Sequence, residues 1–184
     1  MPSDPDEVPI FSYNFYSGGN ESLPRYLKLP IPSDTLRILA IGNSYAQDGL
    51  SYLPYVLREL SPNTEVVLGI AFIPACKLEL HHQNLRNHAK IYEYDKFDSR
   101  PDSIFDAEAD TLLYLQRDST YTITKNRSLH EIITDEQWDI VTFQQVSNKS
   151  FKVSTITPHL KAVIDTVRKH STKDIHFGWI LTPA

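Results

Sequence analysis

The residue whose position is best suited to chemistry is Ser44. It follows a largely apolar run from Leu36 to Ile41 and a Gly42-Asn43 turn, and a helical pattern of apolar residues begins shortly afterwards. An apolar run closed by a glycine turn and followed by a helix is typical of a central strand in a parallel sheet. The carboxyl ends of such strands bind ligands, and a helix start offers unpaired N–H groups. The Ser44 hydroxyl could therefore act as a nucleophile, or Asn43 and Ser44 could simply turn the chain and cap a helix.

The residues around this serine resemble a known motif. Ile41-Gly42-Asn43-Ser44-Tyr45 is similar to the first block of the SGNH/GDSL-type hydrolases, most of which have Gly-Asp-Ser at this place. The Gly-Asn-Ser form resembles an uncharacterised branch of that superfamily. This resemblance implies that Ser44 is the nucleophile for ester hydrolysis and that its own N–H forms part of an oxyanion hole. It also implies that Asn43 and Tyr45 border the substrate.

The loop after the second expected strand would supply another oxyanion donor. It reads Ile73-Pro74-Ala75-Cys76-Lys77-Leu78, in which Cys76 and Leu78 align with the Gly-Gly-Cys-Ser-Leu pattern of the same branch. Pro74 and Ala75 stand in place of the glycines. Because proline has no N–H, only the amide of Ala75 or Cys76 could be the donor. We interpret the Cys76 thiol as a small buried apolar group and not as a nucleophile, because no base flanks it.

The loop after the third expected strand carries two adjacent glutamines. Phe143-Gln144-Gln145-Val146-Ser147 resembles the branch's Leu-Gln-Gln-Gly-Ser, where other superfamily members have Gly-x-Asn-Asp. A glutamine N–H at the end of a strand could reach an oxyanion, so Gln145 is the expected side-chain donor. Asn148 is a substitute that could also contact the substrate. In the alternative interpretation, Gln144 and Gln145 only hydrogen-bond the backbone of the loop.

The sequence offers no histidine base with the spacing that the superfamily uses. None of the seven histidines lies three residues after an aspartate, so Asp-x-x-His is absent from the chain. Only His82 has a carboxylate at that distance, Glu79, and we expect this pair to be a surface ion pair on a helix. We expect His176 to lie in a strand, in the core or on a sheet face. Without a base the serine is a poor nucleophile, because losing one triad member costs about four powers of ten in rate.

No metal or nucleotide motif is present. The densest cluster of ligand residues is Glu79, His81, His82 and His88, but it has neither His-Glu-x-x-His nor paired-cysteine spacing. The glycine turn before Ser44 lacks both Gly-x-Gly-x-x-Gly and the Walker Gly-Lys-Ser. We therefore expect no metal and no cofactor.

Composition narrows the classes of function. A net charge of -5 and a pI near 5.8 argue against a nucleic-acid surface. No apolar run approaches the roughly 18 residues that cross a bilayer. The polar, acidic opening is not a signal peptide, so the protein is either cytosolic or exported after removal of a signal. Cys76 is the only cysteine, which excludes an intrachain disulfide and leaves the compartment undecided.

The order of the apolar patterns predicts an α/β fold. We expect a flavodoxin-like three-layer sandwich with a mainly parallel sheet and an inserted antiparallel hairpin region, which is also the SGNH scaffold. Residues 1–34 would form an irregular N-terminal arm, and 35–184 a domain that, by the resemblance, ends before its Asp-x-x-His block. Strands are expected at 36–41, 65–72, 139–144 and 174–181, helices at 50–60, 77–90 (a modest, exposed one), 128–134 and 155–170, and hairpins over 91–125.

Two functions are consistent with these observations. The resemblance implies a serine esterase acting on an O-acyl ester, such as an acetyl group on a carbohydrate, and weak or inactive without its histidine. The alternative is a non-catalytic binding or interaction protein on the same scaffold. In that case a protein partner or a second copy would cover the incomplete sheet.

Overall fold

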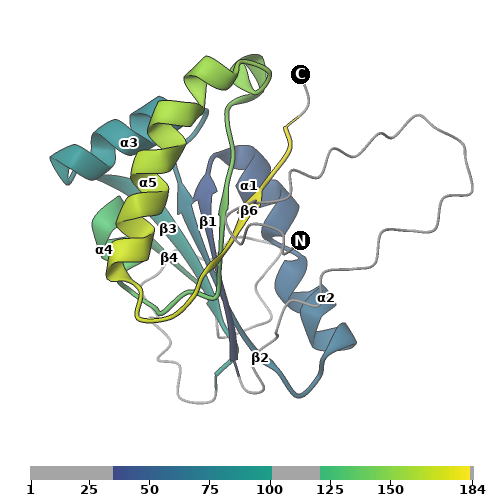
Figure 1. Ribbon diagram of the computed structural model, residues 1–184. Helices are drawn as coiled ribbons and strands as arrows, with labels where there is room; N and C mark the ends of the chain where they lie inside the picture. Colours follow the sequence, from purple (N-terminus) through teal and green to yellow (C-terminus); the bar gives the residue numbers. More distant parts are fainter. Residues whose placement is uncertain (1–34, 101–120, 183–184) are drawn as a thin grey trace, which may run out of the picture. The chain divides into compact units, whose positions relative to one another are not determined.

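The computed structural model describes residues 35–100 and 121–182, which form a three-layer α/β sandwich. Its sheet has six strands in the order β4-β3-β2-β1-β5-β6 (Figure 1). β2, β1, β5 and β6 pair in parallel, whereas β3 is antiparallel to β2 and β4 is antiparallel to β3. The predicted α/β class is confirmed. The strands are β1 Thr35–Gly42, β2 Glu65–Phe72, β3 Lys90–Asp98, β4 Tyr121–Ser128, β5 Ile140–Phe143 and β6 His176–Trp179.

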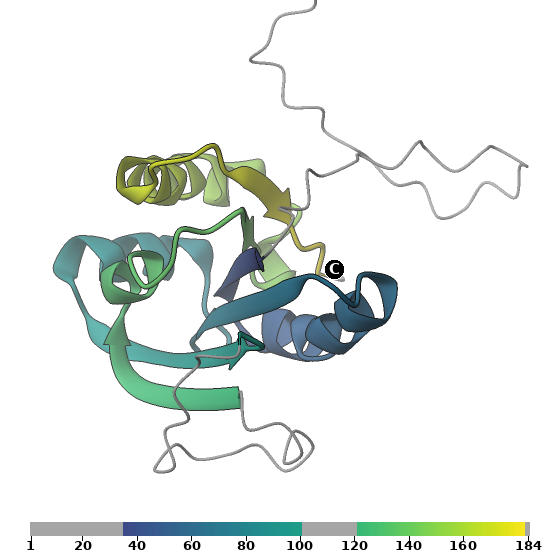
Figure 2. The same ribbon diagram turned by 90° about the horizontal axis from the view of Figure 1, so that it is seen from below.

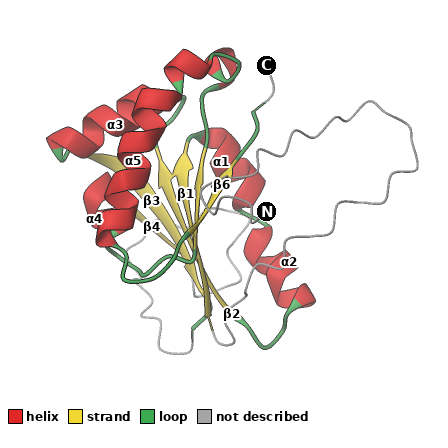
Figure 3. Ribbon diagram, viewed as in Figure 1, coloured by secondary structure: helices red, strands yellow, loops and turns green. Residues whose placement is uncertain are grey.

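Helices cover both faces of the sheet (Figure 2 and Figure 3). Apolar side chains of α1 and α2 pack on one face, and those of α3, α4 and α5 pack on the other. Two single turns of 3₁₀ helix, η1 and η2, lie between β5 and α5. The helices are α1 Ser44–Leu50, α2 Leu53–Leu60, α3 Leu78–Asn87, α4 Leu129–Ile133 and α5 Thr157–His170, and the 3₁₀ turns are η1 Ser147–Lys149 and η2 Val153–Thr155.

The central strands are buried because helices cover them from both sides. Along β1, Leu39 and Ile41 belong to the core under α3, α4 and α5, while Ile38 and Ala40 belong to the core under α1 and α2. All four side chains are no more than 4% exposed. A continuous apolar run is what a parallel strand covered on both faces requires, which is why the sequence located β1 and β2 to within a residue.

The parallel strands lie on both sides of β1 in the sheet, with β2 on one side and β5 and β6 on the other. The chain passes from β1 to β2 through α1 and α2 on one face, and from β5 to β6 through α5 on the other. Since β1 and β5 are neighbours, the loops that follow them leave the same edge of the sheet toward opposite faces. Open α/β sheets bind their ligands at this position. Ser44 stands there, directly after the end of β1.

Two of the predicted helices differ from what we expected. The apolar pattern over 50–60 belongs to two helices, α1 and α2, and Pro54 lies in the first turn of α2, where its missing N–H removes no helical hydrogen bond. The helix expected over 77–90 is α3, and it is not merely exposed. Its His81 and Leu85 are buried because this face packs on the sheet and on α4 and α5.

The region expected as an insertion, 91–125, contributes to the main sheet. β3 and β4 form an antiparallel pair, and β3 also pairs with β2 from Val67 to Phe72. The expected arm over 1–34 and the part of the hairpin region over 101–120 lie outside the described residues. Within the described ranges no helix is long and apolar enough to cross a membrane.

Candidate functional site

Ser44 is the first residue of α1 and is exposed. Within the described ranges, neither its hydroxyl nor its backbone N–H makes a hydrogen bond. The N–H is free because residues in the first turn of a helix have no intrahelical acceptor. Both groups are therefore unpaired within the part of the chain that the structure describes.

Asn43 fixes the position of this serine. Its side chain is only 1% exposed and makes three hydrogen bonds. Its Oδ1 accepts from the Tyr45 N–H at 3.1 Å, which caps α1, and also from the Gln144 side-chain amide. Its Nδ2 donates to the Cys76 carbonyl at 3.0 Å. One buried amide thus joins the loops that follow β1, β2 and β5, and the helix cap predicted from the sequence is a part of this arrangement.

Gly42 permits this close packing. A Cβ atom built at Gly42 would lie 2.8 Å from the Ala46 Cβ and 2.8 Å from the Cδ and Oε1 atoms of Gln144. Real Cβ atoms do not approach other atoms so closely, so the glycine is needed for space. The sequence indicated a turn here, but only the packing shows why no larger residue fits.

The loop after β2 gives different roles to its two candidate donors. The Cys76 N–H donates to the Ile73 carbonyl at 3.2 Å, so it is already used in a turn. Ala75 is exposed, and across the described ranges its N–H meets no acceptor. Its φ of 51° is in the left-handed region, which glycine adopts at lower cost, and this matches the glycine in the pattern that the loop resembles. Ala75 remains a candidate donor, whereas Cys76 does not.

The Cys76 thiol is buried, as the sequence indicated. Its side chain is 1% exposed, and burial raises the pKa of the thiol to about 12, despite the opposing effect of Lys77. A thiol with so high a pKa holds almost no thiolate at neutral pH. Cys76 is therefore a packing residue.

The expected role of Gln145 needs correction. Its side-chain Nε2 donates to the Thr155 carbonyl at 3.0 Å and to the Thr155 Oγ1 at 3.3 Å. Its Oε1 accepts from the N–H of Leu78 at 3.0 Å and from the N–H of Val146 at 2.9 Å. Both ends of this buried amide are thus occupied, and neither N–H is free for an oxyanion. This geometry agrees with the alternative interpretation, in which the glutamines hold the loops.

The other expected site residues lie on the surface. Tyr45 is 41% exposed in the first turn of α1, next to Ser44. Asn148 is exposed in η1, in the loop between β5 and α5. Both stand after the carboxyl end of a central strand, where a ligand could meet them.

No histidine among the described residues hydrogen-bonds to Ser44, and one expectation about histidines was wrong. Glu79 does not pair with His82, because its carboxylate binds the Lys77 ammonium at 2.9 Å. His176 lies in a strand, as expected, and of the two places expected for it the core is excluded, because it is the first residue of β6 and is exposed. The nitrogen Nδ1 of His82 instead lies 3.2 Å from Nδ1 of His159, a contact between residues 77 positions apart that spacing could not reveal.

The sequence did not single out Asp95 of β3, which lies beside the carboxyl-terminal half of β2. It is paired with Ile70 in the sheet, is 1% exposed, and accepts a hydrogen bond from Gln47 of α1 at 2.8 Å. Burial raises the pKa of its carboxyl to about 6, with Glu93 adding to the rise and Gln47 opposing it. Asp95 thus holds α1, the helix that begins with Ser44, against β3.

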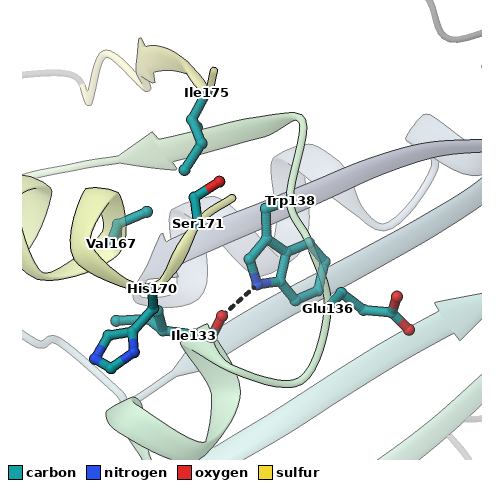
Figure 4. Close-up of a pocket in the computed structure, with 7 residues that line it drawn as sticks. All are labelled: Ile133, Glu136, Trp138, Val167, His170, Ser171 and Ile175. Carbon is teal, nitrogen blue, oxygen red and sulfur yellow. Dashed lines mark hydrogen bonds between the residues drawn. The ribbon is translucent and has the colours of Figure 1, made fainter. Parts of the chain in front are cut away.

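The pocket in Figure 4 lies at the other end of the sheet. It is bordered by residues before β5 and by the ends of α4 and α5, and the Trp138 indole N–H donates to the Ile133 carbonyl at 3.0 Å. Since Trp138 precedes β5 and Ser44 follows β1, which is parallel to β5, the pocket and the serine are at opposite edges. Across the described ranges no group of three or more His, Cys, Asp or Glu side chains is arranged to hold a metal ion.

Fold and site together define an α/β protein whose exposed serine follows its central parallel strand. The chain belongs to the family described as Domain of unknown function (DUF4886), whose model matches residues 37–182. It is similar to the crystal structure of a DUF4886 family protein from Bacteroides uniformis, with 28% sequence identity and a TM-score of 0.64. That match covers 79% of this chain and 49% of the other, so this chain spans about half the length of that protein. Among curated proteins, none matches the chain.

Proposed function

We propose that this protein is a serine ester hydrolase of the SGNH type, with Ser44 as its nucleophile. The observation that carries the proposal is the exposed, uncommitted hydroxyl of Ser44 at the end of the central strand. Asn43, immediately before it, is fixed by buried hydrogen bonds to three loops or turns, so the serine is held by a rigid neighbour. A positioned nucleophile loses little entropy when it reacts.

Two backbone N–H groups support the same proposal. Those of Ser44 and Ala75 are free among the described residues, and they belong to adjacent loops, because β1 and β2 are neighbouring strands. Backbone N–H groups of this kind stabilise the oxyanion that forms when a hydroxyl attacks an ester. The left-handed backbone of Ala75 is the type of strained conformation that proteins keep at functional sites.

The substrate that we propose is an O-acyl ester, such as an acetyl group on a carbohydrate, bordered by Tyr45 and Asn148. Asn43, which the resemblance also placed there, does not border it, because its side chain is buried and hydrogen-bonded inside the protein. Tyr45 offers an exposed ring next to the nucleophile, and Asn148 an exposed amide across the edge. Since no histidine among the described residues contacts Ser44, we expect this polypeptide to turn over slowly. A serine that lacks its base is slower by about four powers of ten.

The test is hydrolysis of p-nitrophenyl acetate, with Ser44→Ala as the decisive variant. We expect slow release of p-nitrophenol by the unaltered protein and none above background by Ser44→Ala. Ser154→Ala is the matched control, because Ser154 is an exposed serine in η2 and its substitution should leave the rate unchanged. Equal rates for the unaltered protein and Ser44→Ala would show that Ser44 is not the nucleophile.

A second function, binding without catalysis, is favoured by exposed apolar side chains near the same edge. Phe151 and Val153, between β5 and α5, are 64% and 71% exposed, and Leu181, after β6, is 72% exposed. Exposed apolar groups of this size commonly mark an interaction surface. The ester assay distinguishes the two functions, because absence of turnover at high protein concentration would support binding alone.

A further inference from the structure

Five of the seven histidines have ring contacts with another histidine, and they form one pair and one group of three between the helices that cover one face of the sheet. α3 and α5 lie side by side in this layer (Figure 1). His82, in the first turns of α3, meets His159, in the first turn of α5. At the other ends of the helices, His130 of α4 has ring contacts with both His88 and His170.

We propose that His82 and His159 bind a divalent transition-metal ion of the zinc class between α3 and α5. Their Nδ1 atoms are 3.2 Å apart, and the two rings are tilted by 55°. Two imidazole nitrogens on a tetrahedral zinc ion, each about 2.05 Å from the metal, are separated by about 3.3 Å. The two nitrogens already have the spacing that such an ion imposes.

The backbone around this pair is held in place before any ion binds. Gln145 accepts a hydrogen bond from the N–H of Leu78, the first residue of α3, and donates to the carbonyl of Thr155, two residues before α5. One buried amide thus joins the starting turns of the two helices that carry the histidines. Ligands held on rigid elements lose little entropy when a metal binds, which favours binding.

The surroundings of His82 favour its neutral imidazole, which is the form that metals bind. Partial burial, His159 and Arg86 all lower the pKa of His82 below its ordinary value. His159 is the ring that faces His82 directly, while Lys77 and Lys149 are the cations near Glu79 on the same side. At neutral pH one ring can donate its Nδ1–H to the other. When a metal binds, the donor ring takes the tautomer with its proton on Nε2, by exchange with water, so that both Nδ1 lone pairs can bind the ion.

Glu79 is the nearest candidate for a third ligand. It lies three residues before His82 on α3, and its carboxylate interacts electrostatically with His159. Its ion pair with Lys77 is exposed, and exposed pairs contribute little, so the carboxylate can leave Lys77 at small cost. Across the described ranges no set of three ligands is preformed, so the proposed site has the histidine pair as its fixed ligands, with Glu79 and water as the groups that would complete the coordination.

Titration calorimetry with zinc chloride alone, at pH 7.5 and on the whole chain, tests the proposal. We expect one ion per chain, and loss of about tenfold or more in affinity for His82→Ala and for His159→Ala, since loss of even an outer-shell partner costs 10- to 100-fold. Glu79→Gln should weaken binding less than either. Lowering the pH to 5.5 should weaken binding in the unaltered protein, because both imidazoles must be neutral.

Two comparisons make the result specific. His176→Ala, which removes an exposed histidine of β6, should bind zinc as the unaltered protein does. If His82→Ala and His159→Ala bind zinc with unchanged affinity, or if only His130→Ala loses it, the ion is not at the proposed site and the proposal is wrong. Absence of binding to the unaltered protein at millimolar zinc would also overturn it. Circular dichroism of each variant confirms that it is folded.

Discussion

The two ends of the sheet are held together by different chemistry. At the carboxyl ends of the parallel strands, around Ser44, the buried polar groups are mostly neutral amides that hydrogen-bond one another and the backbone. At the amino ends, charged side chains that are 11 to 34% exposed form a network of ion pairs. The charged residues of this network are Arg37, Lys96, Asp98, Arg100, Asp135, Glu136, Asp139 and Lys173.

This difference suits the two ends to different tasks. Ion pairs that remain partly in water join elements at moderate cost, but they present charges to anything that approaches. Neutral amides can be buried completely when their partners are present, and they carry no charge of their own. The Ser44 end therefore depends mainly on the close packing of neutral groups, with the buried Asp95 carboxyl as an exception. The amino end depends on charge and tolerates water.

The largest effect should follow from breaking the packing at the Ser44 end. We expect Gly42→Ala to lower the free energy of unfolding by about 2 to 3 kcal/mol, because its Cβ would clash with Ala46 and Gln144. Urea unfolding measures this effect, and it should not change in 1 M salt. Gly49→Ala is the control, since a Cβ at Gly49 meets nothing within 4 Å and alanine favours the helix. Equal stabilities of the two variants would show that the packing around Gly42 relaxes freely.

An intermediate effect, dependent on pH, should follow from Asp95 at the same end. Because burial raises its pKa in the folded protein to about 6, the folded state holds this proton more tightly than the unfolded state does. The contribution of Asp95 to the free energy of unfolding is therefore fully present below about pH 4, and it is lost as the pH rises through about 6. Asp95→Asn should remove that loss. Between pH 4 and pH 8 the free energy of unfolding of the variant should therefore rise by about 2 kcal/mol relative to that of the unaltered protein.

Urea unfolding at pH 4 and at pH 8 measures the Asp95 effect. Asp48→Asn is the control, because Asp48 is exposed. Parallel pH profiles for Asp95→Asn and the unaltered protein would contradict the assignment.

The smallest effect should come from the charged end. Glu136 accepts from Arg37, Lys96 and Arg100, and although burial alone would raise its pKa, the hydrogen bonds from Lys96 and Arg100 lower it overall. Glu136→Gln should cost about 1 kcal/mol at pH 7 and less in 1 M salt. The cost should shrink as the pH falls below about 4.5, because the unfolded chain takes up the Glu136 proton first, and it should vanish below the lowered pKa of the folded state.

Asp165→Asn, which breaks an exposed pair with Lys161, is the control for Glu136→Gln and should have almost no effect. If 1 M salt did not reduce the loss of stability in Glu136→Gln, the proposed difference between the charged end and the Ser44 end of the sheet would be wrong.

Most of the fold could be predicted from local patterns, because those patterns are read within one element. The apolar runs located β1 and β2, and Ser128 and Thr134 bound α4 as expected. The site was predictable only in part. Ser44 and Asn43 lie where the turn predicted, since a strand end and a helix start are both local features.

The sequence by itself determined the α/β class, the positions of β1 and β2, and the serine that follows the central strand. Only the tertiary structure decided which polar groups are used up inside the protein. Gln145 looked like a free donor until Leu78 and Thr155 occupied both ends of its amide, and His82 and Glu79 looked like a pair until each bound a different partner. A hydrogen bond is decided by distance in space. Gln145 meets Leu78 and His82 meets His159 within 3.2 Å, although these partners are 67 and 77 positions apart in the sequence.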